Sequence, residues 1–292
     1  MNETLTFVVD KSYSGKKAGI FLRVVCGLSA RTLSLLKRNP GSLTRGGELL
    51  RTIDILDEGD IVEINLPKEE NSIIPIEGNL DILYEDAYLL IVNKPAATPV
   101  HPVKKHQTDT LANFVAYKYQ GEGAGFVFRA VNRLDSDTSG AVIITRNRHI
   151  ASLMQKARID KHYFAVCHGT LNEGGTVDEP IALREDSKIV RCVTPSGKSA
   201  VTHYNPIVAY RDRTLLDIWL ETGRTHQIRC HMSHIGHPLM GDDLYGGGLD
   251  EIPRQALHCH TISFTHPISG KEINVIAPLP DDMAKLIPNT DI

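Results

Sequence analysis

The chain lacks several features that would assign it to other classes of protein. Only five of its 292 residues are cysteine, and no two of them form a CxxC pair. Scattered cysteines are typical of free thiols, so we expect a cytoplasmic protein without a disulfide framework. No apolar run approaches the roughly 20 residues that a membrane helix needs, so we expect no membrane partner. Residues 1–17 carry acids and have no long apolar stretch, which predicts that no signal peptide is present.

An excess of positive charge is also absent, since the formal net charge is −3 at pH 7. A protein of this charge binds nucleic acid only through a local basic surface. Residues 31–51 hold five basic side chains and one acid, and residues 146–161 hold the same numbers. A solvated face is the ordinary explanation of such a run, and a phosphate-binding surface is the alternative.

Residues 1–67 are predicted to form a small separate unit. Apolar residues at helical spacing predict a helix over residues 18–27, and Ser29 is a good N-cap for a second helix over residues 30–39. The other expected elements of this unit are a hairpin turn at Gly46 and Gly47 and a strand over residues 60–66.

This order of elements resembles the alpha-L RNA-binding domain, a fold shared with a ribosomal protein of the small subunit. Two features depart from that pattern. The usual arginine-leucine-aspartate start of the first helix is absent, and Thr44-Arg45-Gly46 replaces valine-asparagine-glycine at the turn. The resemblance implies that residues 1–67 bind RNA. Residues 68–79 are polar, with one proline and one glycine, and predict a linker.

Residues 80–292 are predicted to form one larger α+β domain. Strands outnumber helices and do not alternate with them, which favours a mixed, largely antiparallel sheet with flanking helices. The expected strands cover residues 88–93, 141–146, 163–169, 201–210, 215–221, 261–266 and 273–278. The expected helices cover residues 109–120, 147–158 and 224–235, with Asp109, Asn147 and either Thr222 or Thr225 as N-caps.

A polar cluster, NRLDSDTSG, stands immediately before the apolar strand that begins at residue 141. Loops at the ends of rigid strands often carry catalytic groups, and Asp135 in this loop has the chemistry of a nucleophile, a base or a charged anchor. A turn rich in local hydrogen bonds is the alternative explanation of the same residues.

Two further segments carry groups that suit a binding pocket. Arg224 and Arg229 lie on a predicted helix, and a buried arginine opposite a carboxylate stabilises the ionised form of that carboxylate. Tyr163 follows the basic residues Lys161 and His162 on a predicted strand. An aromatic ring in that position suits base stacking, although core packing is the commoner role.

Together the motifs RLDSDTSG, KHYFAVCHG and TGRTHQIRCHMSHIGHPLMGDDLYG, in this order, resemble the RluA class of RNA pseudouridine synthases. VNKPAATPVHP, residues 92–102, is similar to the opening motif of that family. GKSAVTHY, residues 197–204, fits the stretch that precedes its third motif. The resemblance covers residues 80–280, nearly the whole predicted larger domain, and implies the pseudouridine synthase fold.

The resemblance also implies roles for individual residues. The implied catalytic residues are Asp135 as the catalytic aspartate, Tyr163 as a candidate for the final proton abstraction, and Arg229 as the partner of Asp135. The implied substrate-binding residues are Arg133, which enters the RNA stack in place of the flipped nucleotide, Ile228, which supports the far face of the base, Lys161 and Arg224. Asn132 replaces a histidine common in the family, which puts a hydrogen bond of that side chain in doubt.

The implied activity is the isomerisation of specific uridines in structured RNA to pseudouridine. Ribosomal RNA is the expected partner because of the alpha-L-like unit, and transfer RNA is the alternative. The reaction needs neither oxidation nor phosphate transfer, and the chain has no Walker sequence, so we expect no cofactor. We also expect a monomer.

Other functions fit parts of the sequence. A zinc hydrolase is suggested by the histidines and cysteines of the C-terminal third, which are His226, His231, His234, His237, His258, His260, Cys230 and Cys259. Their spacing does not match that of helical zinc ligands, so structural histidines are favoured and no metal is expected. A non-catalytic RNA-binding module would also suit the basic segments, and a glycosylase that releases the base would use a similar pocket.

Overall fold

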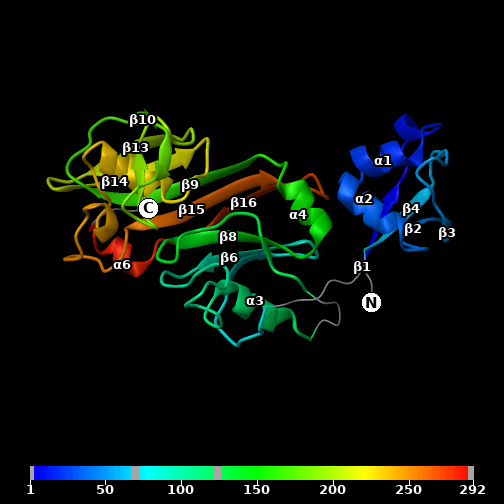
Figure 1. Ribbon diagram of the computed structural model, residues 1–292, viewed down its shortest axis with the longest axis horizontal. Helices are drawn as coiled ribbons and strands as arrows, with labels where there is room; N and C mark the ends of the chain where they lie inside the picture. Colours follow the sequence, from blue (N-terminus) through cyan, green and yellow to red (C-terminus); the bar gives the residue numbers. More distant parts are fainter. Residues whose placement is uncertain (1–2, 67–72, 122–125, 289–292) are drawn as a thin grey trace.

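The computed structural model describes residues 3–66, 73–121 and 126–288. Figure 1 shows a small N-terminal unit at one end of the molecule and a long sheet that organises the rest. The predicted linker, residues 68–79, lies partly outside the described residues.

The N-terminal unit, residues 3–66, packs short helices on a four-stranded sheet of order β1-β4-β2-β3. Its helices are η1 (Lys11–Tyr13), α1 (Ala18–Val24) and α2 (Ala30–Lys37). Its strands are β1 (Glu3–Val8), β2 (Leu43–Arg45), β3 (Glu48–Leu49) and β4 (Ile61–Leu66). Apolar side chains from both layers, such as Phe21, Leu36 and Ile64, form a core of their own.

Two local predictions for this unit are confirmed. Oγ of Ser29 accepts a hydrogen bond from the backbone N–H of Thr32 at 3.0 Å, which caps α2. Gly46 and Gly47 have φ values of 55° and 88°, which form the two-residue turn between β2 and β3. Strand β1 was not expected, and it pairs antiparallel with β4 along its whole length.

The long sheet has ten strands and is mixed but mostly antiparallel, as predicted. Its main strand order is β10-β13-β14-β9-β15-β8-β6-β5, with β16 paired to β15 and β7 paired to β8. Only β8 and β15 pair in parallel among the strands that the structure describes. The strands are β5 (Asp81–Glu85), β6 (Leu89–Lys94), β7 (Arg129–Ala130), β8 (Ser139–Thr145), β9 (Ile159–His168), β10 (Gly175–Asp178), β13 (Val201–Ala209), β14 (Arg213–Leu220), β15 (Leu257–Thr265) and β16 (Glu272–Ile276).

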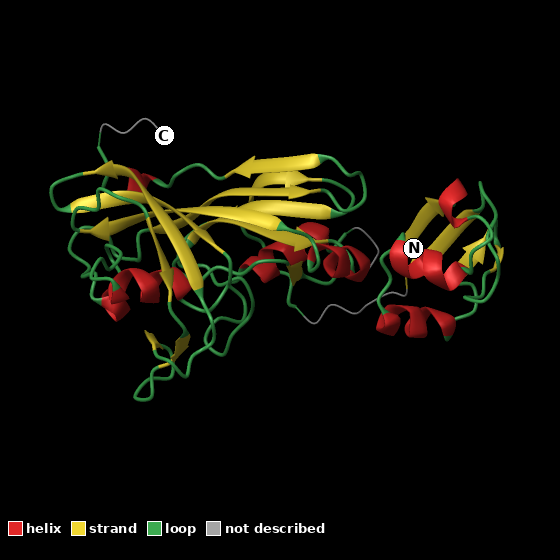
Figure 2. Cartoon of the chain, turned by 90° about the horizontal axis from the view of Figure 1, so that it is seen from above, coloured by secondary structure: helices red, strands yellow, loops and turns green. Residues whose placement is uncertain are grey.

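Helices cover this sheet mainly on one side, as Figure 2 shows. They are α3 (Leu111–Tyr119), α4 (Arg148–Met154), α5 (Gln227–His234), η2 (Asp243–Tyr245) and α6 (Asp281–Ala284). A separate two-stranded hairpin is formed by β11 (Ile181–Leu183) and β12 (Arg191–Val193). Every residue of β8 is buried, so the loop that enters this strand is attached to a fully buried part of the sheet.

Two of the predicted helix starts are wrong. Thr110, not Asp109, caps α3, because Thr110 and Asn113 form a reciprocal capping box. Neither Thr222 nor Thr225 caps α5, which begins at Gln227 after His226. Asn147 caps α4 as predicted, since its side chain accepts from the N–H of Ile150 at 2.9 Å.

Within the described ranges, no helix is both long enough and apolar enough to cross a membrane.

Candidate active site

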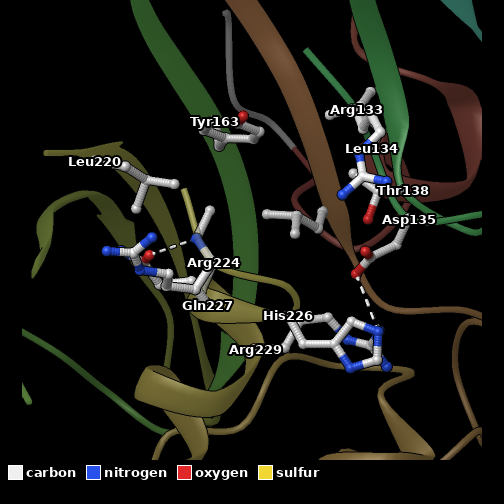
Figure 3. Close-up of a pocket in the computed structure, with 12 residues that line it drawn as sticks. Arg133, Leu134, Asp135, Thr138, Tyr163, Leu220, Arg224, His226, Gln227 and Arg229 are labelled. Atoms are coloured by element: carbon white, nitrogen blue, oxygen red, sulfur yellow. Dashed lines mark hydrogen bonds and ion pairs between the residues drawn. The ribbon is translucent and has the colours of Figure 1, made fainter. Parts of the chain in front are cut away.

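A pocket opens where the loop before β8 meets β9, β14 and α5 (Figure 3). Its empty volume is about 380 Å³, part of which is open to solvent. The lining combines polar groups and apolar side chains, namely Arg133, Leu134, Asp135, Thr138, Tyr163, Leu220, Arg224, His226, Gln227, Ile228, Arg229 and Leu257. A concave site in which apolar side chains stand beside convergent polar groups is typical of a substrate site.

Asp135 lies in the wall of this pocket, where a single arginine holds it. Nη1 of Arg229 donates to Oδ2 of Asp135 at 3.1 Å, which is the contact expected from the sequence. The other two nitrogens of Arg229 donate to the carboxylate of Asp242, at 2.7 and 2.8 Å. The side chain of Asp242 is fully buried, so this two-point contact fixes the plane of the guanidinium and directs its free edge at Asp135.

Arg229 keeps its charge in this buried position. Burial alone lowers the pKa of an arginine, but the hydrogen bonds and charges of Asp242 and Asp135 raise the pKa of Arg229 overall. The ring of Tyr245 also lies 5.1 Å from the guanidinium carbon, a distance that gives a cation–π contact. Arg229 therefore presents a fixed positive charge to Asp135.

Lys94 anchors the loop that carries Asp135. Its Nζ donates to the carbonyl oxygens of Pro95 and Ser136, both at 2.8 Å. The side chain of Lys94 is completely buried, and this burial lowers its pKa to about 7 despite the opposing charge of Asp137. The backbone next to the catalytic candidate is thus tied to the end of β6.

Arg254 holds the same loop from another side. Its Nη1 donates to the carbonyl oxygen of Asp137 at 3.1 Å, while Nε and Nη2 bind the carboxylate of Asp282. Next to Arg254, the side-chain amide of Gln255 donates to Oγ1 of Thr138 at 3.2 Å. The loop therefore has anchors on two sides.

Tyr163 lines the pocket from β9, in the middle of the long sheet. Its side chain is 7% exposed, and this burial raises its pKa well above the ordinary value. The structure thus places the phenol in the pocket wall, where an aromatic ring suits base stacking. The predicted proton abstraction by Tyr163 stays a prediction.

Three of the four predicted substrate-binding residues lie in this pocket. Arg133, Ile228 and Arg224 all line it, and Arg133 is exposed. Arg224 is held near the rim by a hydrogen bond from its Nε to the carbonyl oxygen of Ser199 at 3.0 Å. Lys161 is on β9 but is not part of the pocket lining.

Asn132, which departs from the family pattern, makes two hydrogen bonds with its side-chain amide. Its Nδ2 donates to the carbonyl oxygen of Ala141 at 3.0 Å, and its Oδ1 accepts from the N–H of Ile143 at 2.8 Å. The amide thus uses both of its polar ends to join the loop that carries Asp135 to β8.

The family follows from comparison with known proteins. A family model described as RNA pseudouridylate synthase matches residues 88–234. An uncharacterized RNA pseudouridine synthase of Bacillus subtilis, YjbO, is 42% identical over 268 residues, which cover 89% of this chain and 95% of that protein. This chain belongs to the RNA pseudouridylate synthase family. It is an isomerase that acts on RNA, of the RluA class.

Other members of the family agree with this assignment. Ribosomal large subunit pseudouridine synthase D of Haemophilus ducreyi is 38% identical over 248 residues, 78% of this chain and 76% of that protein. The solved structure of human RNA pseudouridylate synthase domain containing 1 has a TM-score of 0.57 and 27% identity. It covers 68% of this chain and 83% of the human chain.

Several residues around the pocket of this synthase were missed by the sequence analysis. Asp242 fixes Arg229, Lys94 holds the loop, and His226 lies with its Nε2 3.7 Å from Oδ2 of Asp135. Asp242 and His226 belong to the segment that carried the resemblance, but their contacts with Arg229 and Asp135 appear only after folding.

Several of the histidines that suggested a zinc site have hydrogen-bond partners in the fold. His231 bonds Oγ1 of Thr202 and the carbonyl oxygen of Glu179, and His258 bonds Oγ of Ser139. Among the described residues, no group of three or more histidine, cysteine or acidic side chains is arranged to hold a metal ion. These contacts are those of histidines with a structural role.

Proposed function

We propose that this synthase isomerises specific uridines of ribosomal RNA to pseudouridine, with Asp135 as the catalytic carboxylate. The observation that carries the proposal is the chain of contacts from Asp242 through Arg229 to Asp135 at the wall of a partly apolar pocket. Preorganised charge of this kind suits a reaction in which one carboxylate must stay ionised and correctly oriented.

The other residues of the pocket suit recognition of a flipped uridine. A uridine inside folded RNA reaches such a pocket only by leaving its stack, which costs a few kcal/mol. Arg133 fills the vacated space, and the ring of Tyr163 stacks against the uracil. Ile228 supports the far face of the base. Arg224 and Lys161 contact the RNA backbone at and beyond the rim.

The reaction breaks the bond between the ribose and nitrogen one of uracil and rejoins the ribose to carbon five. Carbon five gives up its proton to water, and nitrogen one takes up a proton, so the product is an isomer of the uridine. No electron or phosphoryl group is transferred, so the proposal includes no cofactor. Asp135 supplies the ionised carboxylate, and Arg229 with Asp242 holds it in place.

The N-terminal unit is proposed to be an alpha-L-like RNA-binding domain spanning residues 1–67, joined by residues 68–79 to a catalytic domain spanning residues 80–292. Three exposed cations, Arg31, Lys37 and Arg38, lie on or beside α2. None of them has an acidic partner within 4.0 Å among the described residues, so they are available for phosphate. We further propose a cytoplasmic monomer.

Ribosomal RNA is preferred because relatives such as the Haemophilus ducreyi protein are named for the large ribosomal subunit. The test uses large-subunit ribosomal RNA and a transfer RNA pool, each transcribed with uridine tritiated at carbon five. Purified chain should release tritium from the ribosomal transcript, and sequencing of the product should place pseudouridine at a small number of positions.

The outcomes separate the rival functions. Tritium release from transfer RNA alone would show that the substrate is transfer RNA and not ribosomal RNA. Free uracil in the reaction would indicate a glycosylase. Binding without any tritium release from either RNA would contradict the proposed activity.

A further inference from the structure

His226 has an unusual backbone for its position at the start of α5. Its φ of 56° and ψ of 22° lie in the left-handed region. Only Ala97 shares a positive φ among the described residues that are not glycine. Strain of this kind persists where the surrounding structure imposes it, and it often occurs at functional sites.

The strained backbone brings the imidazole into the pocket wall. The side chain of His226 is 11% exposed, and its Nε2 lies 3.7 Å from Oδ2 of Asp135. Its Nδ1 lies 3.1 Å from the hydroxyl oxygen of Tyr245, and the two rings meet edge to face. In Figure 3, a dashed line joins Asp135 to the cluster formed by His226 and Arg229.

The hydrogen bonds of Tyr245 allow the imidazole proton of His226 to lie on Nε2. The backbone N–H of Arg191 donates to the hydroxyl oxygen of Tyr245 at 2.8 Å. The hydroxyl hydrogen of Tyr245 is then free to donate to Nδ1 of His226, which leaves the imidazole proton on Nε2, facing Asp135.

The charges around the imidazole favour its neutral form. Burial lowers the pKa of His226. The negative charge of Asp135 raises this pKa, and the positive charge of Arg229 lowers it further. Of the other nearby charges, Asp242 raises the pKa of the ring and Arg191 lowers it. A neutral ring with its proton on Nε2 is a hydrogen-bond donor to the carboxylate.

Both donors approach the same oxygen of Asp135. Arg229 contacts Oδ2 at 3.1 Å, and His226 faces Oδ2 at 3.7 Å. No donor among the described residues lies within hydrogen-bond distance of Oδ1. The unengaged oxygen is therefore Oδ1.

Given the proposed function, we propose that His226 is a positioning residue that, together with Arg229, holds Oδ2 of Asp135 and leaves Oδ1 as the atom that reacts with the target uridine. The separation of 3.7 Å shortens to a hydrogen bond when bound RNA excludes water from the pocket.

The test compares His226→Gly with the native chain in single turnovers, using the tritiated ribosomal transcript and saturating enzyme. Glycine adopts the left-handed backbone without strain, so this variant removes the imidazole and keeps the turn. The rate constant should fall on the order of 10- to 100-fold, the range expected for a hydrogen bond to a charged group. The dissociation constant for the RNA should stay within about twofold, and added imidazole should restore part of the rate.

Two further variants keep the test decisive if the glycine variant folds poorly. His226→Gln retains an N–H donor and should lose less rate than His226→Gly. His234→Gln makes the same exchange at an exposed histidine at the far end of α5 and should leave the rate unchanged.

A native rate in His226→Gly would overturn the role of His226, and so would a loss of RNA affinity at an unchanged rate. A slow His226→Gly variant that imidazole does not rescue would also count against the imidazole. Absence of tritium release by the native chain would instead overturn the proposed function, and the role of His226 with it.

Discussion

The N-terminal unit and the pocket of the long sheet bury different kinds of polar groups. Among residues 4–66, the buried polar side chains are uncharged hydroxyls, those of Thr32, Ser42 and Thr44. Around the pocket, four ionisable side chains are buried, and they contact either the loop of Asp135 or one another. They are Lys94, Arg229, Asp242 and Arg254.

The two regions therefore differ in whether charged side chains are buried. Burying an ion costs several kcal/mol and is offset only by well-formed hydrogen bonds, so buried ions fix geometry more than they stabilise the fold. Around the pocket, the contacts that offset this cost are also those that hold Asp135. In the N-terminal unit, the cations proposed to bind phosphate, Arg31, Lys37 and Arg38, are exposed to solvent.

The largest expected effect is on turnover. Asp135→Asn should lower the rate of pseudouridine formation by about 10²- to 10⁴-fold, because the amide cannot act as a charged nucleophile or base. RNA affinity should change little. Asp212→Asn, the same exchange at an exposed carboxylate paired with Arg213, is the control. Turnover near the native rate in Asp135→Asn would contradict the assignment.

A second prediction compares ion pairs in the two regions. Asp242→Asn should lower the free energy of unfolding by about 3–5 kcal/mol, because it leaves the buried charge of Arg229 without its main partner. Asp54→Asn, in the exposed pair with Arg51, should change it by at most about 1 kcal/mol. Urea denaturation measures the free energy of unfolding of both variants. Equal losses would show that the buried and the exposed ion pair contribute alike.

A third prediction concerns the cations of the N-terminal unit. Replacing Arg31, Lys37 and Arg38 together by glutamine should weaken RNA binding. The slope of log Kd against log salt should fall by roughly 0.7–0.9 for each phosphate that is no longer neutralised. The rate at saturating enzyme should not change. A filter-binding series across salt concentrations tests this, and an unchanged slope would remove these residues from the RNA interface.

The smallest expected effect is the pH dependence that Lys94 contributes. Its pKa is about 7 in the folded chain and 10.5 when unfolded, so between these values the unfolded chain binds more protons and stability rises with pH. The stability of the native chain relative to Lys94→Met should therefore increase by on the order of 1–2 kcal/mol from pH 7 to pH 9. A pH-independent difference would show that Lys94 titrates normally.

Local signals predicted much of the fold because they depend on near neighbours. Ser29 and Asn147 each cap a helix by accepting a hydrogen bond from the N–H three residues ahead. Gly46 and Gly47 form the turn of one hairpin. Strand β1 was missed because its pairing with β4 joins residues about sixty positions apart. The start of α5 was misplaced because a left-handed histidine takes the N-cap without a side-chain hydrogen bond.

The pocket was predicted in part. Asp135, Tyr163 and Arg229 belong to recognisable motifs, and the structure brings all three to one pocket. The burial of Lys94 and the approach of His226 to Asp135 depend on contacts across the fold, which no local pattern encodes. Lys161 lay in a motif but outside the pocket, because motif membership does not specify where a side chain lies.

The most direct measurement of the central claim is a structure of the Asp135→Asn variant bound to substrate RNA. The account predicts that the target uridine is flipped into the pocket, with the side chain of residue 135 about 3–3.5 Å from the reacting ribose or base and the ring of Tyr163 against the uracil. A target nucleotide bound elsewhere, or one out of contact with residue 135, would contradict the claim that Asp135, held by Arg229, is the catalytic carboxylate.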